Sequence, residues 1–149
     1  MENEKVTALN QLLKGTHMGA SIFKDLREKL KSDMLKKEFD EILSTFRLHE
    51  KALTALIETE GGDPVDSAGF MGTITDMVGH LKHLSLDNDK EVLETAVENM
   101  RTASKAVNDF EHRHIIGNPN VEKTIHIMRD DYGSIFHKLD KYLIEFKFD

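Results

Sequence analysis

The sequence of 149 residues contains no cysteine and no tryptophan, and it has only two prolines and two tyrosines. Without cysteine, the chain cannot form disulfides, thiolate metal sites or cysteine nucleophiles. The few prolines and aromatic residues, together with 32% charged residues, are typical of a helical protein with a charged surface rather than of a β-sandwich. The length corresponds to one domain with its own core, so we expect a single domain over residues 1–149.

Membrane and nucleic-acid signatures are also missing from the sequence. No stretch approaches about eighteen consecutive apolar residues, the length that a membrane-spanning helix needs. The segment Met1–Lys5 lacks the basic and apolar regions of a secretory signal. The formal net charge of −7 disfavours phosphate neutralisation by a basic surface. We therefore expect a cytoplasmic protein that binds neither membranes nor nucleic acids.

What the sequence does contain is helical periodicity in four long segments, near residues 3–30, 34–60, 88–114 and 121–146. Apolar residues recur there at steps of three and four, which predicts four amphipathic helices. The expected inward positions of the second segment are Leu35, Phe39, Ile42, Phe46, His49, Leu53 and Leu56, and those of the last are Val121, Ile125, Met128, Tyr132, Ile135, Leu139, Tyr142 and Phe146. The sequence therefore predicts an all-α fold, an antiparallel four-helix bundle whose last turn also packs.

The breaks between these segments carry recognisable helix signals. Ser32 or Asp33 can cap the second helix, and Asp87 or Asn88 can cap the third. The run Gly61-Gly62-Asp63-Pro64 terminates the second helix. Between the second and third helices, apolar spacing over residues 66–86 predicts a short accessory helix, weakened by three glycines.

Small residues gather in the middle of the first helical segment, at Gly15, Thr16, Gly19 and Ala20. Such residues either let a neighbouring helix approach closely or leave room for a larger group between helices. The sequence leaves both interpretations open.

Four-helix bundles of this length often hold two metal ions, with a glutamate from each of two helices and a Glu-x-x-His pair from each of the others. Only Glu111 and His114 have that spacing, and they lie near a helix end. A hemerythrin-like diiron centre also fits poorly, because only His126 and Asp131 match its final spacing. We expect Glu111 and His114 to be surface groups.

His49 and Glu50 are the candidate metal ligands at mid-bundle height. One interpretation of His49 is a buried neutral imidazole bonded to Tyr132, Thr16 or a backbone carbonyl. The other is a metal ligand or a pH-sensitive group. A metal site would need further inward carboxylates at the same height, and Glu98 and Asp131 are the candidates.

The chain resembles an uncharacterised bacterial ferritin-like family, domain of unknown function 2383. The residues that carry the resemblance are Leu9, Asn10, Leu12, Leu13, Gly19, Phe23, Phe46, Glu50, the turn Gly61–Pro64, Ser67, Gly69 and the helix Glu91–Asp109. The resemblance implies a ferritin-like bundle, usually without assigned activity. It retains Glu50, but Ala20 and Met100 stand where a glutamate is frequent, and Tyr132 or Gly133 stands where the last helix would offer a ligand.

These observations favour a non-catalytic ferritin-like bundle that acts as an interaction or structural module without a cofactor. The alternative is a redox or storage-type protein that binds iron or another divalent transition metal at an irregular site near His49 and Glu50. Wide apolar stripes on the first and last helices also predict a homodimer through helix faces.

Overall fold

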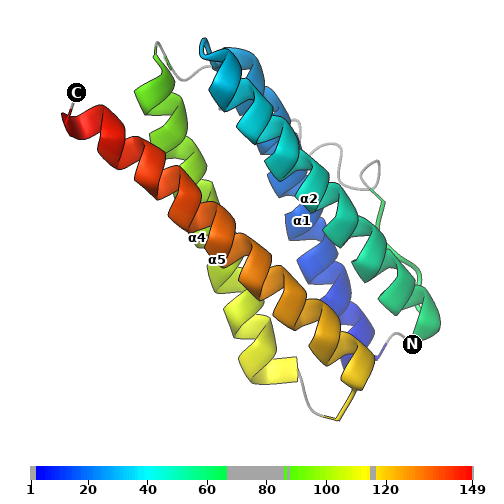
Figure 1. Cartoon of the computed structure of the whole chain (residues 1–149). Helices are drawn as coiled ribbons and strands as arrows, with labels where there is room; N and C mark the ends of the chain where they lie inside the picture. Colours follow the sequence, from blue (N-terminus) through cyan, green and yellow to red (C-terminus); the bar gives the residue numbers. More distant parts are fainter. Residues whose placement is uncertain (1–2, 67–85, 87, 115–116, 149) are drawn as a thin grey trace.

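The computed structural model describes residues 3–66, 86, 88–114 and 117–148. Four long helices make up most of this part of the chain: α1 (Glu4–Lys29), α2 (Asp33–Thr59), α4 (Asp89–His114) and α5 (Pro119–Phe148). They lie side by side as a four-helix bundle (Figure 1), which confirms the predicted fold class. The accessory helix expected over residues 66–86 falls largely outside the described residues.

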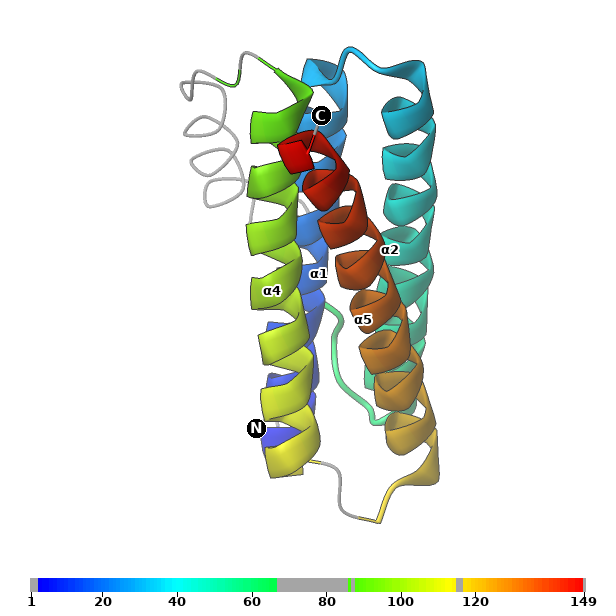
Figure 2. The ribbon, with the colours of Figure 1, turned by 60° about the vertical axis from the view of Figure 1, so that its left-hand side comes forward.

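The packing order of the helices differs from their order along the chain. α1 contacts α2 and α4, and α5 contacts α4 and α2, so α1 and α5 lie on one diagonal. Neighbouring helices run antiparallel, as Figure 2 shows for the pairs α1/α2 and α4/α5. α2 ends near the start of α1, where Oε2 of Glu60 lies 4.0 Å from Nζ of Lys5. α4 begins at the opposite end of the bundle, next to Lys31. The end of α2 and the start of α4 therefore lie at opposite ends of the bundle.

The helix boundaries follow from capping groups that the sequence carries. The side chain of Asn3 accepts a hydrogen bond from the Val6 amide, and Ser32 accepts one from the Leu35 amide. Asn88 caps α4 through the amide of Glu91. Ser32 and Asn88 are thus confirmed as caps. Gly61 ends α2 with a φ of 79°, a left-handed conformation that favours glycine.

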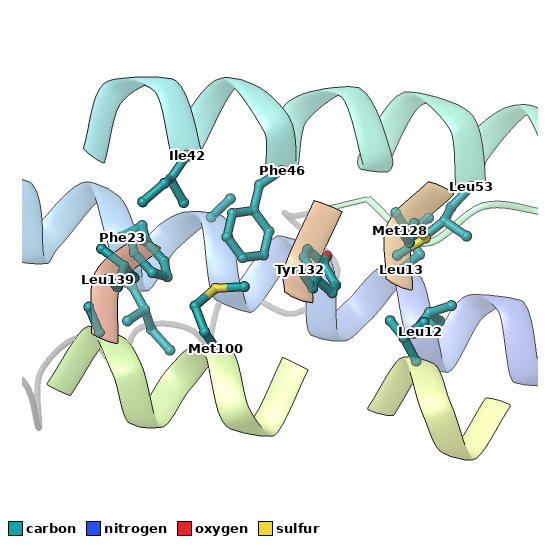
Figure 3. Close-up of a cluster of buried hydrophobic side chains, with 14 of the residues drawn as sticks. Leu12, Leu13, Phe23, Ile42, Phe46, Leu53, Met100, Met128, Tyr132 and Leu139 are labelled. Atoms are coloured by element: carbon teal, nitrogen blue, oxygen red, sulfur yellow. The ribbon is translucent and has the colours of Figure 1, made fainter. Parts of the chain in front are cut away.

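A row of stacked aromatic side chains forms the centre of the core. The ring centroid of Phe23 lies 5.3 Å from that of Phe39 and 5.5 Å from that of Phe46, and Phe46 lies 5.4 Å from Tyr132. Leucine and methionine side chains from all four helices fill the space around this row (Figure 3). Every inward position predicted for the second helix is buried, including His49.

The prediction that the last turn of α5 packs is wrong for Phe146, whose exposed fraction is 39%. Ile144, one turn before the end of the helix, is also exposed. The apolar spacing continues in the sequence here, but these side chains are only partly covered. None of the four described helices has the length and apolar character of a membrane span.

Candidate functional site

Buried polar side chains meet near the middle of the bundle, on α1, α2 and α5. Thr16 and His17 come from α1, His49 and Glu50 from α2, and Tyr132 from α5, and none is more than 9% exposed. Burying such groups costs free energy unless they find hydrogen-bond partners. We call these five residues the polar layer, and their hydrogen-bond partners determine whether it could bind a ligand.

His17 and Glu50 form the more deeply buried pair of this layer. Nδ1 of His17 hydrogen-bonds to Oε2 of Glu50, joining α1 to α2. Oε1 of the same carboxylate accepts a 2.9 Å hydrogen bond from Nη1 of Arg47, and Nε2 of His17 lies 3.0 Å from the carbonyl oxygen of Val65. Both oxygens of Glu50 and both ring nitrogens of His17 are thus engaged by protein groups.

The partners of His17 also indicate its protonation. A carbonyl oxygen can only accept a hydrogen bond, so the bond to Val65 requires a proton on Nε2. Nδ1 faces one oxygen of Glu50, and the Arg47 guanidinium donates to the other. These hydrogen bonds link two helices and the segment after α2.

Sequence reasoning did not identify His17. The residue directly follows Thr16, which the seam of the first helix places inward, and it does not itself fall at a seam position. The structure buries both, because α1 packs against α2 on one side and α4 on the other. The usable signal was the wide apolar stripe of this helix, which indicates contacts on two sides.

His49 forms a second imidazole–carboxylate pair, with Asp131 of α5. Nε2 of His49 lies 2.8 Å from Oδ2 of Asp131, and the His49 ring meets the Tyr132 ring edge-on with centroids 4.9 Å apart. One of the two interpretations of His49 had it bonded to Tyr132, Thr16 or a backbone carbonyl; its hydrogen-bond partner is Asp131. Nδ1 of His49 is buried without a hydrogen-bond partner. A neutral ring protonated on Nε2 suits this site, because it leaves a lone pair rather than an N–H group unpaired.

Tyr132 lies between the two pairs. Burial raises the pKa of its hydroxyl, and the nearby carboxylates of Asp131 and Glu50 raise it further. The hydroxyl interacts with the side chain of Thr16, whose own hydroxyl donates to the carbonyl of Leu12 at 2.9 Å. Tyr132 therefore stays a neutral phenol and extends the polar layer from α5 to α1.

The predicted ligands His49 and Glu50 do not point at a common centre. His49 faces α5 and Glu50 faces α1, as their different partners show. In the described part of the chain, no three histidine, aspartate or glutamate side chains gather as metal ligands would. Of the two additional carboxylates considered, Asp131 binds His49, whereas Glu98 lies on the surface beside Arg101.

The other sequence candidates lie apart from this layer. Glu111 pairs with Arg129 at 2.9 Å and lies 3.9 Å from His126 on α5, whereas His114 packs its ring on Phe110. Glu111 and His114 thus have separate partners. The described contacts of His126 and Asp131 are likewise with different groups.

The buried face of α4 contributes no polar ligand to the layer. Its buried residues are Val92, Leu93, Ala96, Val97, Met100, Val107 and Phe110. Met100 lies beside Phe46 and Tyr132 in the core (Figure 3). At this height α4 also carries Asn99 and Thr102, which line a pocket together with Thr16 and Tyr132, but neither side chain is a carboxylate or an imidazole.

Comparison with known proteins adds a family but no activity. Neither the curated proteins nor the solved structures gave a match. One family model, described as Domain of unknown function (DUF2383), matches residues 4–112, from the first residue of α1 almost to the end of α4. The matched region holds His17, His49 and Glu50, whereas Asp131 and Tyr132 lie beyond it. Because the match extends over most of the sequence, the chain belongs to the DUF2383 family.

Proposed function

We propose that this protein is a non-catalytic ferritin-like bundle that acts as an interaction or structural module. The observation that carries the proposal is the wholly apolar buried face of α4. A two-metal bundle draws carboxylates from all four helices, and α4 has none to offer on that face. The single long connection, between α2 and α4, supports the ferritin-like part of the proposal, since bundles of that type have one long crossover.

The hydrogen-bond partners of the ionisable groups near the middle of the bundle support the same proposal. Glu50 has one oxygen on His17 and the other on Arg47, and Asp131 binds His49. A divalent ion would have to displace these partners before it gained its own ligands. The pairs instead cross-link α1 to α2 and α2 to α5, which is a structural role.

Metal analysis of the untagged protein tests this proposal. After incubation with ferrous iron, manganese or zinc and removal of the excess, we expect less than one ion per chain. The Glu50→Gln variant serves as a control, because it changes the best-placed carboxylate without changing its shape. Two tightly bound ions per chain that are lost in Glu50→Gln would overturn the proposal.

We further propose that the interaction partner is a second copy of this chain, bound through α2 and α5. Leu48, Ala52 and Ala55 lie along one face of α2, and Leu48 is 65% exposed. Ala52 and Ala55 line a surface groove between α2 and α5 together with Ile127, which is 49% exposed. Exposed leucine and isoleucine beside small residues form a surface onto which an identical surface can pack around a twofold axis.

Sedimentation measures this self-association directly. We expect the protein to form dimers at micromolar concentration and Leu48→Lys to dissociate them. Ile144→Lys is the matched control, because Ile144 is exposed on another face of α5 and its replacement leaves the groove unchanged. A monomeric wild type, or dimers that persist in Leu48→Lys, would contradict the proposal.

One observation favours a second candidate function, the binding of a single metal ion near His49. Its Nδ1 lone pair is buried and unpaired, and imidazole nitrogen is a common metal ligand. Addition of ferrous iron under air distinguishes this candidate. A new visible absorption band that is absent in His49→Phe would support it, and unchanged spectra with an unchanged melting temperature would exclude it.

A further inference from the structure

A cavity of about 150 Å³, open to solvent beside the exposed residues Gln11, Thr102 and Ala106, lies between α1 and α4 next to the row of aromatic side chains. Small residues create it: Gly15 on α1 and Ala103 and Ala106 on α4 line it. A Cβ added at Gly15 would meet no atom within 4 Å. The two interpretations of the small residues in α1 thus both apply, at different positions: Gly19 lets Phe46 approach closely, and Gly15 leaves open space.

The chemistry of the cavity wall is mostly apolar and entirely uncharged among the residues described. Phe23 and Phe46 supply aromatic faces, and Ile22 and Leu12 supply aliphatic ones. No described lining residue carries a charge, so a charged ligand would find no counter-charge inside. An enclosed apolar cavity of about this volume holds one benzene-sized ring, so the space here is large enough for one ring with an edge toward solvent.

The cavity also offers hydrogen-bonding groups at fixed positions. The hydroxyls of Thr16 and Tyr132 belong to residues that line it, and both residues are almost completely buried. The Thr16 hydroxyl donates its proton to the Leu12 carbonyl and contacts the Tyr132 hydroxyl, so a ligand can meet it only as an acceptor, through its remaining lone pair. The Tyr132 hydroxyl stays protonated, because burial raises its pKa. The wall therefore suits a ligand with one hydroxyl or N–H group on an otherwise apolar ring.

We propose that this cavity is a binding site for a small, neutral aromatic molecule with a single polar substituent, of the size of phenol. The ring packs against Phe23 and Phe46, and its polar group binds the Thr16 hydroxyl. The site uses residues of α1, α2, α4 and α5, so an occupant would contact all four helices of the bundle. This inference is independent of the proposed dimer, whose surface lies on α2 and α5.

Calorimetric titration of the full-length protein with phenol tests the site. We expect saturable binding of one phenol per chain and a raised melting temperature, since a ligand that binds only the folded state stabilises it. Toluene, which has the same ring without the hydroxyl, should bind about tenfold more weakly, the effect of one lost hydrogen bond. Benzoate, which keeps the ring but carries a charge, should not bind.

Variants locate the binding in the cavity. Ala103→Leu and Ala106→Leu extend side chains into the space and should each abolish binding, and Ala106 is exposed enough to accept leucine without disturbing the fold. Asn108→Leu places a leucine at an exposed position of α4 that does not line the cavity, and it should bind phenol as the wild type does. Thr16→Val should remove the preference for phenol over toluene.

Three results would overturn the proposal. The first is the absence of saturable phenol binding to the folded wild type. The second is binding of benzoate as tight as that of phenol, which would place the ligand on the charged surface. The third is unchanged phenol affinity in both Ala103→Leu and Ala106→Leu.

Discussion

The imidazole of His17 and the carboxylate of Glu50 bind each other across the interface of α1 and α2, and each is only about one-tenth exposed. This contact makes a quantitative prediction. His17→Ala and Glu50→Ala should each lower the free energy of unfolding, because each leaves a buried polar partner unpaired. A double-mutant cycle from urea denaturation should give a coupling free energy of about 1–3 kcal/mol.

The pair Arg27 and Asp40 is the matched control for this cycle. It also joins α1 to α2, with Nε of Arg27 2.9 Å from Oδ1 of Asp40, but its side chains are 39% and 53% exposed. Solvent screening should reduce its coupling to about 0.2–1 kcal/mol. Equal coupling in the two cycles would mean that burial of His17 and Glu50 adds nothing to their interaction.

Gly19 supports a close approach between the same two helices. A Cβ at this position would lie 2.6 Å from Cε1 of Phe46, whose ring is held by Phe23 and Tyr132. Gly19→Ala should therefore destabilise the protein by about 1–3 kcal/mol, although alanine favours helices. Gly133→Ala on α5 should instead stabilise it by up to about 1 kcal/mol, because a Cβ there meets nothing within 4 Å.

Thermal unfolding of the two glycine variants measures this difference. The double variant Gly19→Ala/Phe46→Leu should recover part of the loss, because leucine lacks the ring atoms that the new Cβ would meet. If Gly19→Ala and Gly133→Ala shift the melting temperature in the same direction, the close approach is not under steric constraint.

The sequence predicted the parts of this structure that depend on a single helix. Leu35, Phe39, Phe46 and Leu53 are buried because apolar spacing along one helix determines its inward face. Ser32 and Asn88 cap helices through bonds to residues three positions ahead, which the sequence also displays. The family was identified because its characteristic residues lie within the matched region.

The pairing of polar groups between helices was not predictable in the same way. That His49 binds Asp131 and that Glu50 binds His17 depends on the rotation and height of three helices relative to one another. The exposed Phe146 shows that the burial of an apolar residue also depends on the neighbouring helices. Its spacing matches the seam, but burial requires a neighbouring helix that reaches as far along the bundle.

Tyr132 predicts how stability changes at alkaline pH. Burial raises the pKa of Tyr132 in the folded state above its ordinary value of 10.0. Above about pH 10 the unfolded chain loses this proton and the folded chain keeps it, so stability should fall as pH rises through that range. The contribution of Tyr132 to the free energy of unfolding should fall by up to about 1.4 kcal/mol per pH unit.

Tyr132→Phe isolates this contribution when urea midpoints are compared between pH 8 and pH 11. The variant should lose less stability than the wild type over this range. Lys138 beside Glu38 also has a raised pKa and contributes a fall of the same sign, which both proteins share. Tyr142→Phe is the control, because Tyr142 is only partly buried and its replacement should change the alkaline loss less. An identical alkaline loss in Tyr132→Phe and the wild type would contradict the prediction.

Asp89 ties the start of α4 to the turn between α1 and α2, although 57 and 58 residues separate the partners in sequence. Its two carboxylate oxygens accept the backbone amides of Lys31 at 2.7 Å and Ser32 at 3.0 Å. Asp89→Ala removes both acceptors and should cost about 1–2 kcal/mol. Asp89→Asn keeps one acceptor oxygen and should cost less.

The control for Asp89 is Asp33, which is the first residue of α2 as Asp89 is of α4. Both carboxylates stabilise a helix N-terminus through the helix dipole, an effect of about 0.3–1 kcal/mol. If the bonds to the turn matter beyond this effect, Asp89→Ala must destabilise more than Asp33→Ala. Amide hydrogen exchange supplies the decisive measurement, because only Asp89→Ala should accelerate exchange at Lys31 and Ser32. Equal exchange in the two variants would mean that the turn between α1 and α2 keeps its conformation without the hydrogen bonds to Asp89.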